Sequence, residues 1–109
     1  MEQLLHYVWK HKIFPLSALQ TTSGRPVEVI DPGLPNMNAG PDFFNAKLKI
    51  DGTLWVGNVE VHTQASEWLL HRHDCDKAYD TVILHVVGES NCDVYRTNGE
   101  LVPQMVLTC

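Results

Sequence analysis

Residues 43–62 have the sequence FFNAKLKIDGTLWVGNVEVH, which predicts an antiparallel β-hairpin. The central dipeptide Asp51-Gly52 tolerates positive φ and therefore favours a tight turn between two strands. Apolar and polar residues alternate on both sides of this turn, as expected for strands that cover a core with one face. The expected apolar set is Phe44, Ala46, Leu48 and Ile50 in the first strand, with Trp55, Gly57, Val59 and Val61 in the second, where Asn58, Glu60 and His62 form the opposite, polar set.

The segments before the hairpin predict one helix, one strand and one loop. Over residues 2–12, apolar side chains recur at the three- and four-residue spacings of an amphipathic helix. Residues 27–31 begin with the alternation of a short strand. Residues 32–41 contain three prolines, two glycines and two asparagines, which favour a loop over regular structure.

The segments after the hairpin predict a short helical connection and three further strands. Ser66 is expected to cap a helix over residues 67–70. Residues 81–87 form a nearly uninterrupted apolar run rich in β-branched side chains, which is typical of a strand covered on both faces. Residues 93–96 and 102–107 are expected to form a last hairpin.

This order of elements predicts an α/β fold of the α+β kind. It would have a mixed, largely antiparallel central β-sheet, an N-terminal helix and a short helical connection. A β-rich roll or sandwich is the alternative. The length suits a single domain over residues 1–109. Because the chain ends directly after an apolar run, we expect it to be the N-terminal fragment of a longer protein.

Charge, hydropathy and cysteine content restrict the function classes. The formal net charge of −5 opposes binding to a phosphate backbone unless the basic side chains gather on one surface. No apolar stretch approaches the roughly 18 to 20 residues of a membrane span, and the first residues lack a secretory pattern. The three cysteines include no C-x-x-C pair and therefore resemble reduced thiols. We therefore expect a cytoplasmic protein with no membrane partner.

A candidate catalytic site combines Asp42, at the entry to the hairpin, with Glu60 and His62 on one face of its second strand. Two carboxylates from neighbouring strands can hold Mg²⁺ or Mn²⁺ and leave positions for water and a phosphate. The imidazole of His62 changes charge near neutrality, so it can orient that water or stabilise developing charge. The first hypothesis is therefore a metal-dependent site of this kind, with no organic cofactor.

Four histidines supply a second set of potential metal ligands, since imidazole and carboxylate together suit Zn²⁺, Mn²⁺ or Fe²⁺. His71 and His73 can share one face only if the chain between them is extended, because residues two apart lie on roughly opposite sides of a helix. The full set of candidate metal ligands is Asp42, Glu60, His71, His73 and His85, with His62 beside them.

Each candidate residue also has a structural interpretation. Asp42 suits a turn or cap position that accepts hydrogen bonds from backbone amides. Glu60 suits an exposed strand position, paired with Lys47 or Lys49 across the hairpin. His85 suits a buried site where it is hydrogen-bonded to a neighbour. The second hypothesis is therefore a non-catalytic structural or protein-interaction module, whose open sheet edge pairs with the remaining C-terminal part of its own chain or with another copy in a homo-oligomer.

One resemblance rests on Pro41-Asp42, an intervening strand, and Glu60-Val61-His62. This pattern resembles the PD-(D/E)XK phosphodiesterase superfamily, whose core is a helix, a three-strand meander, a helix and a further strand. The resemblance implies a nuclease-like, metal-dependent site that hydrolyses phosphodiesters, with nucleic acid as the substrate class. His62 stands where that superfamily usually has lysine.

A closer resemblance covers nearly the whole chain. It rests on GPDF at residues 40–43, WVGNVEVH at 55–62, HRH at 71–73 and VILHVV at 82–87. These strings are similar to the bacterial family called domain of unknown function 2851, best known from Bacteroidetes. The resemblance implies a longer protein and supplies no activity.

Overall fold

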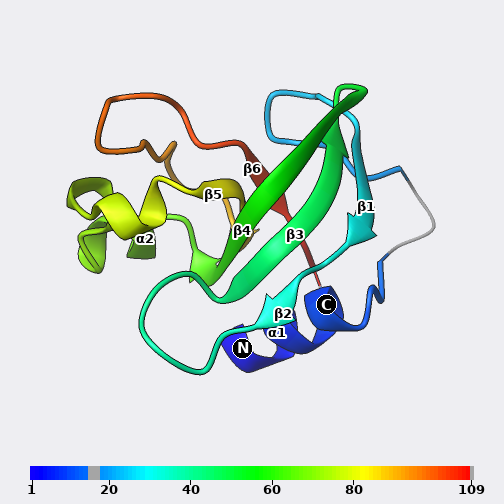
Figure 1. Ribbon diagram of the computed structural model, residues 1–109, viewed down its shortest axis with the longest axis horizontal. Helices are drawn as coiled ribbons and strands as arrows, with labels where there is room; N and C mark the ends of the chain where they lie inside the picture. Colours follow the sequence, from blue (N-terminus) through cyan, green and yellow to red (C-terminus); the bar gives the residue numbers. More distant parts are fainter. Residues whose placement is uncertain (15–17, 109) are drawn as a thin grey trace.

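The computed structural model describes residues 1–14 and 18–108, and within them six strands form one sheet. Its order is β1-β3-β4-β5-β6, with β2 paired to β3 (Figure 1). Strands β1 to β4 pair antiparallel, whereas β5 runs parallel to β4 and β6 runs parallel to β5. The predicted α+β fold with a mixed sheet is therefore confirmed. The elements are α1 (Glu2–Lys10), β1 (Val27–Asp31), β2 (Leu34–Pro35), β3 (Phe43–Ile50), β4 (Thr53–Gln64), α2 (Glu67–Leu70), the 3-10 turns η1 (His73–Cys75) and η2 (Lys77–Tyr79), β5 (Val82–Glu89) and β6 (Gln104–Val106).

The predicted hairpin is formed by β3 and β4. Ile50 pairs with Thr53 across the turn, and the two residues between them have φ of 52° (Asp51) and 79° (Gly52). Positive φ at both central positions gives a turn whose twist matches that of the flanking strands. The Asp-Gly dipeptide thus determines the register that brings the start of β3 beside the second half of β4.

The expected apolar face of β3 is wrong at its first position. Phe43 is 1% exposed, whereas Phe44 is 37% exposed. The cause is Asn45, whose φ of 58° produces a bulge that shifts the pairing with β4 between Phe43 and Ala46. One extra residue reverses the alternation on its N-terminal side. Phe43 therefore enters the core while Ala46, Leu48 and Ile50 keep the predicted orientation.

Both faces of β5 are covered, as predicted for an apolar strand of this kind. On one face α1 packs its buried residues Leu5, Val8 and Trp9 into a core that includes β3, β4 and β5. The opposite face carries a second apolar cluster, built around Trp68 of α2 and Tyr79 of η2 (Figure 1). This second layer covers the polar face of β4, where two of the candidate site residues lie.

Several element boundaries differ from the sequence predictions. The first helix ends at Lys10, and the loop over residues 32–41 includes the two-residue strand β2. Residues 93–96 make only an isolated bridge, between Tyr95 and Leu101, and β6 joins the main sheet beside β5. Ser66 precedes α2 without a side-chain cap; instead the Asn91 side chain accepts a hydrogen bond from Ser66 N. The predicted cap is therefore not formed, and the Ser66 hydroxyl instead accepts a hydrogen bond from Asn91 Nδ2.

Gly33 allows the loop before β3 to pack against that strand. Its φ is +91°, and an added Cβ would lie 2.7 Å from the Phe44 carbonyl oxygen. We expect Gly33→Ala to lower the free energy of unfolding by about 1–3 kcal/mol, because it combines backbone strain with a clash against main-chain atoms. Urea denaturation measures this. Gly24→Ala is the matched control, since Gly24 has φ +85° with no atom near an added Cβ. Equal losses in the two variants would contradict the packing role.

Candidate functional site

A buried polar cluster lies between the sheet and the layer formed by α2, η1 and η2. Glu60 and His62 project from the same face of β4, and His85 of β5 is paired in register with Glu60. His73 opens η1 on the covering layer. The exposed fractions are 4% for Glu60, 2% for His62, 6% for His73 and 0% for His85. Polar groups buried to this extent need partners within the protein.

Asp42 and Glu60 lie together and are linked through the backbone. The Asp42 amide donates to Glu60 Oε1 at 3.1 Å, and the Val61 amide donates to Asp42 Oδ2 at 2.9 Å. These reciprocal bonds fasten the entry to β3 onto the middle of β4. The predicted neighbourhood of the two carboxylates is therefore present, and each carboxylate uses one oxygen on a backbone amide.

The second oxygen of Glu60 lies between two imidazoles. Oε2 is 3.2 Å from His62 Nε2 and 3.1 Å from His73 Nε2. Burial on its own would raise the pKa of Glu60, but the hydrogen bonds and charges of the two histidines outweigh it and lower the pKa to about 2. Glu60 is therefore an ionised carboxylate inside the protein, unlike the exposed, lysine-paired residue of the structural interpretation.

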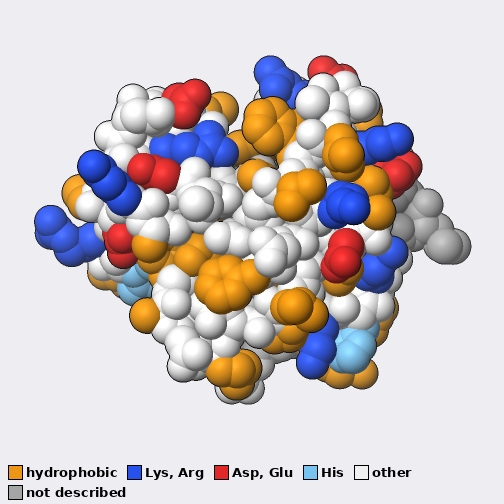
Figure 2. All heavy atoms as spheres, in the orientation of Figure 1, with side chains coloured by type: hydrophobic (Ala, Val, Ile, Leu, Met, Phe, Trp, Pro, Cys, Tyr) orange, Lys and Arg blue, Asp and Glu red, His pale blue; other side chains and the backbone are white. Residues whose placement is uncertain are grey.

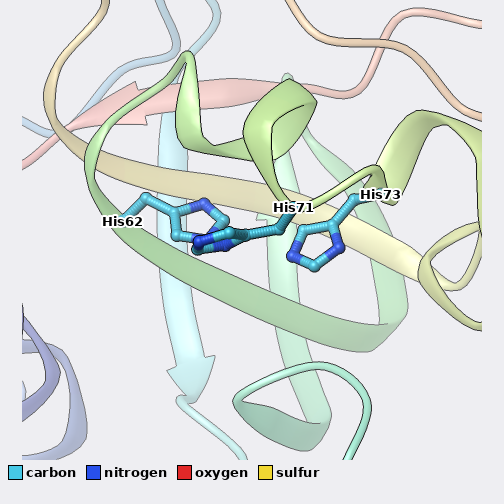
Figure 3. A group of neighbouring side chains, drawn as sticks. All are labelled: His62, His71 and His73. Carbon is cyan, nitrogen blue, oxygen red and sulfur yellow. The ribbon is translucent and has the colours of Figure 1, made fainter.

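His71 joins His62 and His73 to form a three-imidazole group (Figure 3). One ring nitrogen from each residue lies within 4.8 Å of the other two. Between His71 and His73, Arg72 adopts the left-handed conformation with φ 59° and ψ 33°. That backbone conformation turns the chain so that both neighbours face His62, which a continued helix would prevent. A group of imidazoles this close is able to hold a metal ion, and His71 is its exposed member.

His73 is held by aromatic packing. Its ring stacks on Tyr79 at a centroid distance of 3.6 Å, and the Trp68 ring meets it edge-on at 5.3 Å. The nitrogen Nδ1 of His73 is buried and has no hydrogen-bond partner among the described residues. A buried nitrogen without a hydrogen-bond partner costs free energy. The aromatic packing therefore fixes the His73 ring while its Nδ1 remains unsatisfied.

Both ring nitrogens of His85 are engaged by buried side chains. Nε2 lies 2.8 Å from His62 Nδ1, and Nδ1 lies 2.9 Å from Gln104 Oε1. Burial lowers the pKa of His85 to about 4, so this imidazole is neutral at physiological pH. The structure therefore places His85 next to the predicted site but behind His62, as a hydrogen-bonded buried histidine.

The sequence analysis missed Glu2 and His6 of α1, which border the cluster. His6 Nε2 is 3.4 Å from Asp42 Oδ2 and 4.0 Å from Glu2 Oε2. The Asp42 carboxylate beside it raises the pKa of His6. The four-residue spacing of Glu2 and His6, which puts them on one helix face, was the available signal. Gln104 was also missed, although an amide within an otherwise apolar strand is a recognisable irregularity.

Comparison with known proteins identifies a family and no closer relative. A family model described as "Protein of unknown function (DUF2851)" matches residues 2–109. No curated protein and no solved structure matches the chain. Among the residues that the structure describes, no helix is both long enough and apolar enough to cross a membrane.

The Glu60–His62 pair predicts a pH optimum for stability. Since the pKa of Glu60 falls from 4.5 to about 2 on folding, its contribution is complete above pH 4.5 and is lost as the pH falls towards 2. Burial on its own would lower the pKa of His62, but the hydrogen bond and the charge of Glu60 outweigh it and raise the pKa above 6.5. The contribution of His62 to stability is therefore complete below pH 6.5 and is lost as the pH rises through the raised value.

We therefore expect the difference in Tm between the wild type and Glu60→Gln to be largest between pH 4.5 and 6.5. Calorimetry across the pH range measures it. Glu28→Gln is the control, because Glu28 is an exposed residue of β1. A difference that stays constant from acid to alkaline pH would show that the pair does not act as an ion pair.

Proposed function

We propose a function from the site geometry, starting from the premise that the chain belongs to the DUF2851 family of proteins of unknown function. The function that this geometry supports best is a divalent-metal centre for the hydrolysis of phosphodiesters. The observation that carries it is the convergence of His62, His71 and His73 beside the ionised carboxylate of Glu60.

The spacing of the donor atoms supports a metal centre. In a tetrahedral site with bonds of roughly 2.0–2.1 Å, neighbouring ligand atoms lie about 3.3 Å apart. Glu60 Oε2 lies 3.2 Å from His62 Nε2 and 3.1 Å from His73 Nε2, close to that separation. A bound cation would replace the protons that now join these atoms. His71 adds a donor from the exposed side of the group.

The donor types support a choice among metals. Mg²⁺ prefers a shell of oxygen ligands and water, whereas a set rich in imidazole suits Zn²⁺, Mn²⁺ or Fe²⁺. Of the two ions expected from the sequence, Mn²⁺ is therefore the better candidate, and Zn²⁺ joins it. Such an ion supplies Lewis acidity and lowers the pKa of a coordinated water.

Glu60 keeps the role of metal ligand expected from the sequence, whereas Asp42, also expected to be a ligand, is given a different one. Glu60 faces the imidazoles directly and is proposed as a metal ligand. Asp42 binds Val61 N and faces His6 through Oδ2, and its side chain is 25% exposed, so it is proposed to orient water or substrate at the rim. His62 is proposed as a ligand through Nε2, the nitrogen nearest to Glu60.

Nucleic acid is the proposed substrate class, and the order of elements supports it. A helix, three antiparallel strands, a helical connection and a parallel strand occur in the order that the phosphodiesterase resemblance implies. On the face drawn in Figure 2, however, basic and acidic side chains are interspersed. Together with the net charge of −5, this favours a short or single-stranded substrate over an extended duplex.

The second candidate function is a non-catalytic module in which the cluster only stabilises the fold. One observation favours it: Asp42 and Glu60 both accept hydrogen bonds from backbone amides and so join the loop before β3 to β4. The metal titration below distinguishes the two candidates, because a purely structural cluster has no need of a cation.

We expect isothermal titration to detect one equivalent of Mn²⁺ or Zn²⁺ bound per chain. His71→Asn should weaken binding at least tenfold, by analogy with the roughly 10- to 100-fold cost of losing supporting groups at metal sites. His71 is exposed, so this variant removes a donor without opening the core. His11→Asn is the control, because His11 is an exposed histidine at the end of α1. Absence of binding to the wild type would refute the metal centre.

Hydrolysis of bis(p-nitrophenyl) phosphate in the presence of Mn²⁺ tests the reaction. We expect Glu60→Gln to reduce the rate at least 100-fold, the range seen when a group that stabilises transition-state charge is removed. The exposed-site variant Glu28→Gln should retain the wild-type rate. Equal hydrolysis by Glu60→Gln and the wild type would place the activity elsewhere. A wild type that binds metal without hydrolysing the ester would refute the phosphodiesterase proposal.

A further inference from the structure

We propose that Gln104 and His85 form a hydrogen-bonded relay that orients His62, so that Nδ1 of His62 donates to His85 and Nε2 is the nitrogen presented to the metal centre. The inference rests on the proposed function for its purpose, but the relay itself is a property of the metal-free protein. Its members come from three adjacent parallel strands: Glu60 and His62 from β4, His85 from β5 and Gln104 from β6.

The direction of the relay is set at Gln104. Its Nε2 lies 3.0 Å from the carbonyl oxygen of Cys92 and 2.7 Å from Ser90 Oγ. A backbone carbonyl can only accept, so the atom facing Cys92 must be the amide nitrogen. The Gln104 oxygen is therefore the atom that faces His85, and the opposite orientation of the amide would place two acceptors against each other.

The orientation of Gln104 determines the tautomer of His85. Gln104 Oε1 accepts a hydrogen bond, so His85 Nδ1, 2.9 Å away, must carry a proton. A neutral imidazole has one N–H, which leaves His85 Nε2 with a lone pair. Burial lowers the pKa of His85 to about 4 and so keeps the ring in this neutral form.

The tautomer of His85 in turn determines the orientation of His62. The unprotonated Nε2 of His85 lies 2.8 Å from His62 Nδ1, which must therefore donate. The other nitrogen of His62, Nε2, is then the one that faces Glu60 Oε2 at 3.2 Å, where a bound cation would replace its proton. Metal-bound histidines generally donate their other N–H to a partner in this way, which fixes the ring and raises its basicity.

Burial makes the relay specific to these side chains. His85 is fully buried and Gln104 is 3% exposed, so water has little access to replace either partner. Exchanging Gln104 for an apolar residue would leave the His85 N–H without an acceptor, and either nitrogen of His85 could then carry the proton. His62 Nδ1 would then lack its acceptor in part of the molecules, and the His62 ring would be held less firmly.

A long-range ¹H–¹⁵N correlation spectrum of the uniformly ¹⁵N-labelled, metal-free protein tests the relay. It should be recorded at neutral pH, where the His85 ring is neutral. An unprotonated imidazole nitrogen has a distinct chemical shift, and we expect it at Nε2 of His85, with Nδ1 protonated in both His85 and His62. An unprotonated Nδ1 in either residue would overturn the relay. This measurement needs no variant.

Two substitutions of Gln104 distinguish a role in orienting His85 from a role in packing alone. Gln104→Leu removes the acceptor and should both release the His85 tautomer and weaken Mn²⁺ or Zn²⁺ binding by roughly 10- to 100-fold. Gln104→Glu, as the protonated acid that burial favours, keeps an oxygen opposite His85 Nδ1 and a donor opposite the Cys92 carbonyl, so it should preserve the tautomer. Gln20→Leu, at an exposed position, is the control. An unchanged spectrum in Gln104→Leu would overturn the relay.

The two proposals can fail separately. If the wild type shows the expected tautomer of His85 but binds neither Mn²⁺ nor Zn²⁺, the relay is supported and the metal centre is refuted. Metal binding by a wild type in which His85 carries its proton on Nε2 would overturn the relay and leave the metal centre standing.

Discussion

The structure of the site depends on the burial of one negative charge, the carboxylate of Glu60. A carboxylate removed from water is tolerated only when hydrogen bonds and opposite charge replace its hydration. The Asp42 amide contacts one oxygen, and His62 and His73 contact the other. These partners belong to the loop before β3, to β4 itself and to the turn after α2. A single side chain thus holds together segments that are distant in the sequence.

Local rules were sufficient for the parts of the fold in which neighbours along the chain decide the geometry. The Asp51-Gly52 turn has both residues at positive φ, and that turn brings Asp42 next to Glu60. The same rules failed at Asn45, because asparagine only permits positive φ and nothing in its neighbours requires it. The exchange of Phe43 for Phe44 in the core follows from that one residue.

The site itself was partly predictable. Glu60 and His62 could be placed on one face by their spacing, whereas the approach of His71 and His73 required a left-handed Arg72, which the residue type does not favour. The contact of His85 with Gln104 depends on the pairing of β5 with β6. A long irregular connection separates those strands, and no local pattern specifies how it returns to the sheet. Non-local register was therefore the missing information.

The parallel pairing of β4, β5 and β6 fixes the relative positions of the site residues, whereas part of the connection between the strands can change in length. Glu60, His85 and Gln104 occupy one level of the sheet, since Glu60 pairs with His85 and His85 with Gln104. Insertions or deletions at the exposed turn of residues 97–100, between β5 and β6, leave this level intact while β6 keeps its alignment, whereas Ser90 and Cys92 hold the Gln104 amide and must keep their places. A slip by a single residue would turn the amide to the other face of the sheet and bring Pro103 or Met105 to its position. The length of that exposed turn can therefore change in evolution or engineering, and the alignment of the strands cannot.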